Sequence, residues 1–430
     1  MIISSLPSKI TLSSVLCAAA SISLVFAVGD VRANDLLQEK GHYIATAADC
    51  IACHTTPGGK PYAGGRAFLT PFGTVYSTNI TPSSNGIANI TEEQFANSVR
   101  EGIRADGKNL YPAMPYTEYK NITDDDIHAL YAFFKNTVPS VSQKNLTDNL
   151  KFPFNIRYFI KFWNLFQDDE KVETVSSESP QWNRGKYLVE VLSHCGTCHT
   201  PRNFMMSEKT SQKFSGASLG AWYAPNITPS SEGIGNWSTD DLTQYLKSGH
   251  NSLGAYAGGE MLEAIDHSFS KMTDEDLNAI AVYLRTAEKV GTNKIVLSDK
   301  TLPVDPLFAL NAAQNNPEKM DGSTLYQAFC ASCHGDHGQG DALNNLPSMR
   351  GNPLFRLPNT DNIVAAILQG VWPEGPHTQG MPAFSHPLSD DKIVKLVNFL
   401  TTTFGNNASQ TTLQRVQAIR KTLPPNSSAQ

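Results

Sequence analysis

The sequence predicts a mainly α-helical chain made of three consecutive domains of one kind. Three observations predict this fold class. A Cys-x-x-Cys-His motif occurs three times, an amphipathic helix with a Ser/Thr cap follows each motif, and a polar block of the first part of the chain recurs in the second. A chain of 430 residues is also too long for one ordinary core and suits two to four domains.

The three motifs have the attachment pattern of a c-type haem. Two neighbouring thiols can form thioethers to the haem vinyl groups, and the next imidazole can bind the iron. The predicted thioether cysteines are Cys50, Cys53, Cys195, Cys198, Cys330 and Cys333, and the predicted proximal ligands are His54, His199 and His334. Zinc is the alternative, but it usually needs two close pairs of ligands, and these pairs lie 145 and 135 residues apart. The sequence therefore predicts three covalently bound haem c groups.

A methionine opposite each histidine would raise the reduction potential and close the iron to substrates. The predicted ligands are Met114, Met261 and Met381, each ahead of the last helix of its domain. Met272 competes in the second domain, but Met261 is favoured because it lies 147 residues after Met114, the offset that also separates the two Asn-Ile-Thr-Pro-Ser-Ser blocks. Met349 competes in the third domain and lies too early in the chain. Core packing is the ordinary role of methionine, and three matching positions argue against it.

The remaining histidines are expected to be mostly solvated. His128 should lie in the middle of a helix, and His194 is expected at a surface edge. The histidines in loops could approach haem propionates or support proton-coupled quinone chemistry, but a lone loop histidine is more often simply exposed. These loop histidines are His267, His337, His377 and His386.

Each domain is expected to begin with a helix that runs into its motif and to end with a second helix. The expected first helices are Asp35–Ala48, Gln181–Ser193 and Ser323–Phe329. The expected last helices are Asp124–Lys135, Asp274–Thr286 and Asp390–Phe404. Acidic residues in the first turn of the last helices suit the helix dipole, and apolar residues at helical spacing bury one face. The segments between them are rich in Gly, Pro, Asn and Ser, which predicts loops.

These elements predict the domain boundaries. The three domains are expected at residues 34–138, 181–288 and 321–405. A linker at 139–180, first aromatic and then acidic, a second linker at 289–320 and a tail at 406–430 with a short amphipathic segment complete the chain.

The first 33 residues have the composition of a signal peptide. Lys9 precedes an apolar stretch, and small residues around Ala33 suit cleavage. The alternative is an uncleaved anchor, because the stretch is of borderline length for a membrane span. Cleavage removes Cys17, and the six other cysteines all belong to the motifs. This use of thiols fits covalent haem attachment outside the cytoplasm.

No later segment is long and apolar enough to span a membrane. Phe152–Phe166 carries aromatic residues at helical spacing, with Arg157 and Lys161 as cations, which suits a helix lying in the membrane interface. The alternative is a linker buried against the first two domains. Leu413–Leu423 is a second amphipathic candidate. The hypothesis is that one or both hold the protein to the outer face of the inner membrane.

Composition excludes some function classes. The chain has 40% hydrophobic and 17% charged residues, as expected for a globular protein. Its formal net charge of -6 argues against nucleic acid as a partner, because phosphate binding requires a basic face. No Gly-x-Gly-x-x-Gly fingerprint follows an expected strand, so no flavin or nicotinamide site is predicted.

The three Cys-x-x-Cys-His units, the Asn-Ile-Thr-Pro blocks and the aromatic linker together resemble a known family. It comprises the triheme cytochrome c subunits of bacterial membrane-bound dehydrogenases: gluconate 2-dehydrogenase and the alcohol, aldehyde and fructose dehydrogenases. The resemblance implies class I cytochrome c-like domains, each wrapped round a covalent haem. It also implies a catalytic partner subunit with a flavin or quinone cofactor, and it allows for a small third subunit. Electrons would pass to ubiquinone at the periplasmic face of the inner membrane, where the exported protein is peripherally attached.

The predicted function is therefore electron transfer from a partner dehydrogenase to membrane ubiquinone. Two alternatives stay open: a haem enzyme with an open iron site, and a free-standing periplasmic electron shuttle. The three methionines argue against the first, and the aromatic linker argues against the second. The interpretation favours a non-catalytic subunit of a complex that acts on CH-OH donors, with the substrate, the haem order and the quinone site left open.

Overall fold

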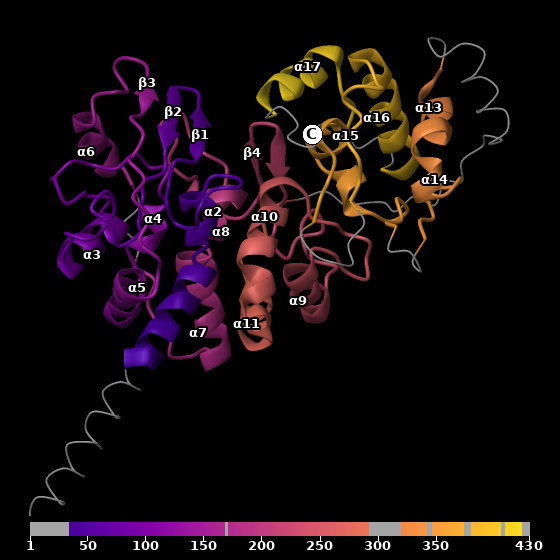
Figure 1. Cartoon of the computed structure of the whole chain (residues 1–430). Coiled ribbons are helices and arrows are strands. Elements are labelled where there is room, and N and C mark those ends of the chain that lie inside the picture. The colour runs from indigo at the N-terminus through magenta and orange to yellow at the C-terminus, as the bar shows by residue number, and fades with distance from the viewer. Residues whose placement is uncertain are drawn as a thin grey trace, which may run out of the picture.

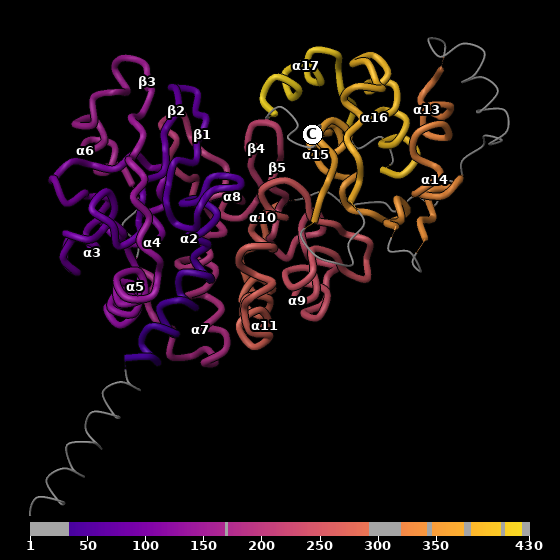
Figure 2. Tube along the Cα trace, viewed as in Figure 1, coloured from indigo at the N-terminus to yellow at the C-terminus, as the bar shows by residue number. Residues whose placement is uncertain are grey.

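The structure is a computed structural model of the chain and describes residues 34–167, 171–291, 320–341, 346–373, 380–405 and 409–423. We call residues 34–167 the first unit, 171–291 the second unit and 320–423 the third unit. The expected signal peptide, most of the second linker and His377 lie outside the described residues. The described chain is mainly helical, as the sequence predicts, and the second unit lies between the other two (Figures 1 and 2).

The first unit begins with a helix over residues 34–47. There follow α2 (Cys50–His54), β1 (Ala67–Thr70), β2 (Gly73–Tyr76), α3 (Glu92–Arg100), α4 (Tyr116–Tyr119), α5 (Asp124–Asn136), β3 (Asn149–Leu150) and α6 (Tyr158–Asn164). The three strands form one antiparallel sheet in the order β1-β2-β3. The strand β3 comes from the expected linker, so the start of that linker is part of the first unit's structure.

The second unit repeats this plan. Its elements are α7 (Pro180–Tyr187), a π-helical turn (Leu188–Leu192), α8 (Cys195–His199), a 3-10 turn (Thr210–Gln212), β4 (Ala217–Leu219), β5 (Trp222–Ala224), α9 (Thr239–Ser248), α10 (Gly259–His267), a 3-10 turn (Phe269–Lys271) and α11 (Asp274–Leu284). The strands β4 and β5 form an antiparallel hairpin. The third unit contains α13 (Gly322–Phe329), α14 (Ala331–His334), a 3-10 turn (Pro353–Arg356), α15 (Asp361–Gln369), α16 (Asp390–Phe404) and α17 (Leu413–Thr422).

The expected first and last helices are present, with ends that differ by at most two residues. Thr123 and Thr273 cap α5 and α11, because each hydroxyl accepts a hydrogen bond from the third backbone N–H of its helix. The expectation of loops between these helices is wrong in part, since α3, α9 and α15 lie there. Both α3 and α9 begin with a capping box, formed by Thr91 with Gln94 and by Ser238 with Asp241. The Gly- and Pro-rich composition around them obscured this local pattern.

The first and last helices of each unit cross at a glycine. A Cβ atom added to Gly41 or Gly185 would lie 2.0 Å from the carbonyl oxygen of Ala129 or Ala279 on the last helix. At Gly322 the same atom would lie 2.4 Å from a carbonyl oxygen of α16. Only glycine allows the two backbones to approach so closely. The glycine that precedes each motif at a similar distance therefore holds the motif against the last helix.

The first two units share one continuous core and a reciprocal contact. Tyr43 of the first unit donates to Asp276 of the second unit at 2.7 Å, and Tyr187 of the second unit donates to Asp126 of the first at 2.7 Å. Each tyrosine lies on a first helix, and each aspartate lies in the first turn of the other unit's last helix. The sequence repeat thus produces two matching tyrosine-to-aspartate hydrogen bonds between the first two units.

The repeated Asn-Ile-Thr-Pro-Ser-Ser block, which starts at Asn79 and again at Asn226, forms hydrogen bonds with the chain that follows the last helix of its unit. The side chain of Asn79 accepts from the backbone N–H of Thr81 and donates to the carbonyl oxygen of Val141 at 2.8 Å. In the second unit, Asn226 donates in the same way to the carbonyl oxygen of Val290 at 2.7 Å. These hydrogen bonds explain why the block recurs, and no contact with a cofactor is needed to explain it.

The third unit has its own core and packs on the β4–β5 hairpin. Trp222 of β5 is buried in the third core, and Asn362 forms two hydrogen bonds with the backbone of Tyr223 at 2.7 and 2.9 Å. The helix α17 completes this core with Val416 and Ile419, both fully buried. The hypothesis that this segment binds the membrane with its apolar side is therefore wrong, because that side faces inward. Within the described part of the chain, no helix has the length and apolar character needed to cross a membrane.

Candidate haem-attachment sites

Each Cys-x-x-Cys-His motif forms a short helix at the end of a first helix. In the first two units the residue before the first cysteine takes a left-handed backbone conformation, with φ of 48° at Asp49 and 37° at His194. This conformation is uncommon for residues other than glycine and turns the chain sharply. In the third unit Cys330 itself ends α13, and α14 begins at the next residue. All three motifs are thereby presented at the ends of buried helices.

The three motif histidines share one hydrogen-bond geometry. The Nδ1 atoms of His54 and His199 lie 2.7 Å from the carbonyl oxygens of Thr78 and Pro225. The Nδ1 atom of His334 lies 2.9 Å from a carbonyl oxygen at Pro347. A carbonyl oxygen only accepts, so each Nδ1 carries the hydrogen and each Nε2 keeps a free lone pair for a metal.

Burial keeps these imidazoles in their metal-binding form. It lowers the pKa of His54, His199 and His334, and the hydrogen bond to the backbone opposes this shift only in part. A neutral ring with a fixed orientation is the arrangement that an axial histidine requires. The histidine donor set therefore fits a haem iron.

None of the six motif cysteines forms a disulfide. Burial raises the pKa of Cys53, Cys195 and Cys330 to about 12 and that of Cys198 to about 11. Among the described residues, no group of three or more His, Cys, Asp or Glu side chains could hold a metal ion. Two thiols and one histidine in each motif, with no further ligand beside them among the described residues, fit thioether attachment better than a zinc site.

Met114 and Met261 occupy corresponding places. Isolated backbone pairs join Ile103 to Asn109 and His250 to Tyr256, and each methionine comes five residues after the second member of its pair. Met261 lies in the first turn of α10, whereas Met114 lies just before α4. The two methionines keep the predicted offset although the local structure around them differs.

Met272 has a different setting. It lies directly before Thr273, the cap of α11, and only 1% of its surface is exposed. Ile122 and Leu388 stand in the same place before α5 and α16 and are 3% and 1% exposed. In every unit, an apolar side chain at this position is buried in the core beneath the last helix. The burial of Met272 is therefore explained by core packing.

In the third unit Met381 is held by its backbone. Its N–H and carbonyl groups pair with those of Val371 at 2.8 and 2.9 Å. The competing residue, Met349, is buried against Phe404 and Gly338. Met381 is only partly buried and so remains the more accessible of the two.

The first two motifs lie close together. Ser193 donates to the carbonyl oxygen of Ala47 at 3.2 Å, and Tyr119 donates to that of Ala48 at 2.7 Å. His194 lies in this junction, with its ring edge-on to Tyr119, and burial lowers the pKa of His194 to about 4. His194 is partly exposed and also contacts the first unit, because the second unit's motif packs against the first unit there. His128 is exposed as expected and pairs with Glu92.

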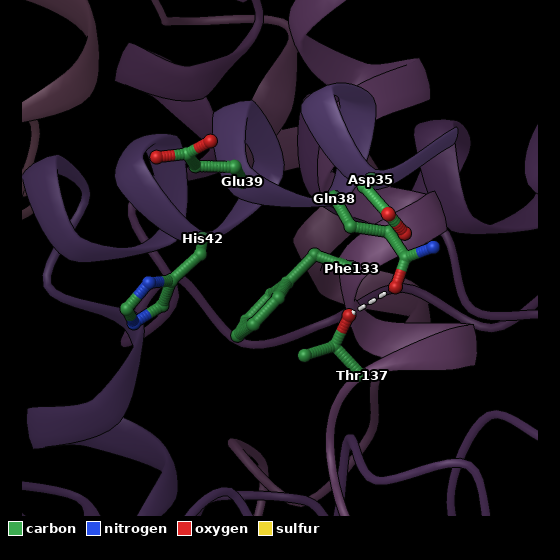
Figure 3. A pocket seen from close by; sticks show the side chains of 6 residues that line it. All are labelled: Asp35, Gln38, Glu39, His42, Phe133 and Thr137. Carbon is green, nitrogen blue, oxygen red and sulfur yellow. Dashed lines mark hydrogen bonds between the residues drawn. The ribbon is translucent and has the colours of Figure 1, made fainter. Parts of the chain in front are cut away.

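The other histidines that were expected in loops differ in exposure, and His267 lies at the end of α10 instead of in a loop. His337 and His386 are exposed, whereas the Nδ1 atom of His267 is buried without a hydrogen bond. An open pocket of about 410 Å³ lies elsewhere on the first unit, between its first helix and α5 (Figure 3). It is lined by Asp35, Gln38, Glu39, His42, Phe133 and Thr137. None of the predicted haem residues lines this pocket.

The aromatic segment of the first linker is attached along one side only. Arg157 pairs with Asp148 and lies over the ring of Tyr111, and Trp163 donates to the carbonyl oxygen of Met205 at 2.7 Å. The outward side chains are between 50% and 78% exposed: Phe152, Tyr158, Phe159, Phe162, Leu165 and Phe166. We call these six residues the aromatic patch. The alternative of a buried linker is therefore wrong for these six residues. Arg157 pairs with Asp148 and stacks on Tyr111, so its charge is engaged within the first unit.

Comparison with known proteins agrees with this geometry. Residues 38–137 match the family Cytochrome c, and residues 317–400 match the family Cytochrome C oxidase, cbb3-type, subunit III. Together with the motif geometry, these matches define the protein as a c-type cytochrome, whose domains bind haem c covalently.

Full-length relatives narrow the class. The fructose dehydrogenase cytochrome subunit of Gluconobacter japonicus is 41% identical over 89% of this chain and 82% of its own length. The gluconate 2-dehydrogenase cytochrome c subunit of Pantoea cypripedii is 36% identical over 92% of each chain. The alcohol dehydrogenase (quinone) cytochrome c subunit of Gluconobacter oxydans (strain 621H) is 36% identical over 92% of this chain and 85% of its own. The chain belongs to the family of cytochrome c subunits of bacterial dehydrogenase complexes.

Proposed function

We propose that the chain carries three haem c groups and passes electrons from a catalytic dehydrogenase subunit to membrane ubiquinone. The observation that carries this proposal is the threefold donor geometry: two cysteines outside any disulfide beside a histidine whose Nδ1 is hydrogen-bonded to a backbone carbonyl. Haem c supplies a one-electron redox centre at such a site. The proposed domains are residues 34–138, 181–288 and 321–405, with one site in each.

The protein residues hold and orient each site. Cys50 with Cys53, Cys195 with Cys198 and Cys330 with Cys333 provide the thioether links, and His54, His199 and His334 provide the proximal nitrogens. Met114, Met261 and Met381 are the proposed sixth ligands. A thioether opposite each imidazole excludes substrate from the iron, which favours electron transfer over a haem enzyme with its own reaction.

The proposed partner is a dehydrogenase subunit that acts on a CH-OH donor with a flavin or quinone cofactor. Relatives of this chain are cytochrome subunits of fructose, gluconate and alcohol dehydrogenases. A small third subunit is part of the proposal, and nucleic acid is not. A protein built to pass electrons between two partners needs no reaction of its own, so we assign it no catalytic residue.

Haem counting and partner reduction test this function. The full chain, produced in a host that matures c-type haem and exports the protein, is expected to contain three haems by pyridine haemochrome assay. A Cys195→Ala/Cys198→Ala variant is expected to contain two. In the complex with its dehydrogenase, the haems should be reduced by the donor alcohol or sugar and reoxidised by a ubiquinone analogue. One or two haems in the unaltered chain, or a high-spin haem spectrum, would contradict the proposal.

We also propose that the protein is exported and attaches peripherally to the periplasmic face of the inner membrane. The aromatic patch supports this location, because exposed aromatic side chains partition into the membrane interface. Its six residues all fall between Phe152 and Phe166, whereas exposed apolar residues scattered singly need no explanation. Lys161 is the cation of this segment that stays exposed.

A triple variant tests the membrane contact. Phe162→Ser/Leu165→Ser/Phe166→Ser is expected to weaken binding to phosphatidylglycerol-containing vesicles by on the order of a hundredfold, because three apolar side chains no longer leave water. Vesicle flotation of the holoprotein measures this change. Trp372→Ser, which removes a 56% exposed aromatic residue from the third unit, should leave binding unchanged. Equal binding of the triple variant and the unaltered chain would rule out the patch as the attachment surface.

A further inference from the structure

The helix α10, which carries Met261, is held by a residue of the neighbouring unit. Two residues after Met261, the carboxylate of Glu263 forms a two-pronged ion pair with Arg66 of the first unit. The Nη2–Oε2 distance is 2.7 Å, and the Nη1 atom donates to Oε1. Arg66 and Glu263 lie 197 residues apart in sequence and are 25% and 30% exposed. A fork of this kind fixes orientation as well as distance.

The same guanidinium also holds the first motif. Its Nη1 atom donates to the carbonyl oxygen of Ala52 at 2.7 Å, between Cys50 and Cys53 in α2. The buried carboxyl group of Asp49 is close enough to Arg66 for their charges to interact. Arg66 thus links the backbone of the first motif directly to the helix that bears the second site's proposed methionine ligand.

In the described part of the second unit, the arginine beside the motif forms its ion pair within its own unit. Arg202 donates to the carbonyl oxygen of Thr197, which corresponds to Ala52, at 3.0 Å. Its carboxylate partner is Glu208 of the same unit at 3.4 Å. An arginine therefore supports this motif carbonyl in both units, although Arg66 and Arg202 stand at different distances from their motifs, and Arg66 also forms an ion pair with the ligand helix of the neighbouring unit.

The start of α10 rests on a different support. The indole of Trp222 lies against Gly258 and Gly259, where an added Cβ would come within 3.2 and 2.5 Å of the ring. Gly259 has a φ of +56°, and α10 begins there. Met261 consequently lies between two supports, the indole below the start of the helix and the Arg66 fork one turn later.

We propose that Arg66 is a positioning residue for Met261, so that the first unit sets how the sixth ligand is presented at the second site. This inference rests on the proposed role of Met261 as a ligand. The physical reason is that α10 spans only Gly259–His267, and a helix this short takes its orientation from its tertiary contacts. Loss of the fork leaves α10 its contact with Trp222 and its buried side chains Leu262 and Ile265, so the helix stays in the core but loses its connection to the first motif.

Variants of the holoprotein test this role. Arg66→Ala is expected to remove about a third of the near-infrared methionine-to-iron absorption and to lower one of three reduction potentials in a potentiometric titration. Arg66→Lys, which keeps the charge and loses the fork, should give a smaller change of the same kind. Glu263→Gln provides a second route to the same loss if Arg66→Ala does not accumulate.

Arg184→Ala is the matched control. Arg184 makes a similar fork with Asp276, at 2.9 and 2.6 Å, on α11, which bears no proposed ligand. The Arg184→Ala variant should have a lower melting temperature, with the methionine-to-iron absorption and the three reduction potentials unchanged.

Two outcomes separate the possible failures. If Met261→Leu changes the absorption and one potential while Arg66→Ala, Arg66→Lys and Glu263→Gln change neither, the positioning role is wrong and the ligand assignment stands. If Met261→Leu changes neither, the ligand assignment is wrong, and the positioning role falls with it.

Discussion

Replacing Met261 by leucine is expected to lower the reduction potential of one haem by on the order of a tenth of a volt, because the axial ligand is a main determinant of haem potential. Leucine has a similar volume and lacks the thioether sulfur, so the change removes the ligand with little effect on packing. Potentiometric titration followed in the visible range measures the potential. The same variant should lose about a third of the methionine-to-iron absorption.

Met272→Leu is the control for this result. Met272 fills the buried place before α11 that Ile122 and Leu388 fill before the other last helices. A volume-conserving change there costs less than about 1.5 kcal/mol of stability and should leave all potentials unchanged. A fall in potential with Met272→Leu and none with Met261→Leu would transfer the ligand role to Met272.

Replacing Gly185 by alanine is expected to destabilise the protein by more than about 3 kcal/mol, the upper end of what overpacking usually costs. The new Cβ would stand 2.0 Å from the carbonyl oxygen of Ala279 and 2.9 Å from the Cβ of Tyr283. The carbonyl oxygen is part of the backbone of α11 and the Cβ of Tyr283 is bonded directly to it, so neither atom can move aside without the helix. Denaturant unfolding of the holoprotein, followed by circular dichroism, measures the loss.

Gly107→Ala separates this clash from backbone strain. Gly107 has a φ of +76° and nothing within 4 Å of the added Cβ, so alanine should cost only about 1–2 kcal/mol there. Gly41→Ala should behave like Gly185→Ala, because its Cβ would meet the carbonyl oxygen of Ala129 at the same distance. Equal losses for Gly107→Ala and Gly185→Ala would show that the helix crossing tolerates a methyl group.

Sequence reasoning succeeded where the deciding interactions are local. The caps Thr123 and Thr273 and the acidic residues after them predicted α5 and α11 to within two residues, because a cap bonds to its own helix. It failed for α3 and α9, whose capping boxes lie among Gly- and Pro-rich segments. It also predicted a helix along most of Phe152–Phe166, whereas α6 covers Tyr158–Asn164.

The amphipathic pattern of α17 shows a different limit. The sequence predicted a helix with one apolar side, and Val416 and Ile419 form that side. The spacing of the apolar residues shows that one side of the helix will be shielded from water. It does not show whether a protein core or a membrane surface provides the shielding. The structure places the face in the third core, where Arg415 pairs with Asp361 and Arg420 with Asp390.

The sequence by itself determined the type and number of the Cys-x-x-Cys-His motifs, the place of six cysteines within them and the matching offset of Met114 and Met261. All of these follow from residue identity and spacing along one chain. Only the tertiary structure decided that His194 packs on Tyr119 of the first unit and that Arg66 pairs with Glu263 across 197 residues. Contacts of this kind leave no periodic or local pattern, because they depend on how two folded units pack, and side chains that meet there can come from any distance along the chain.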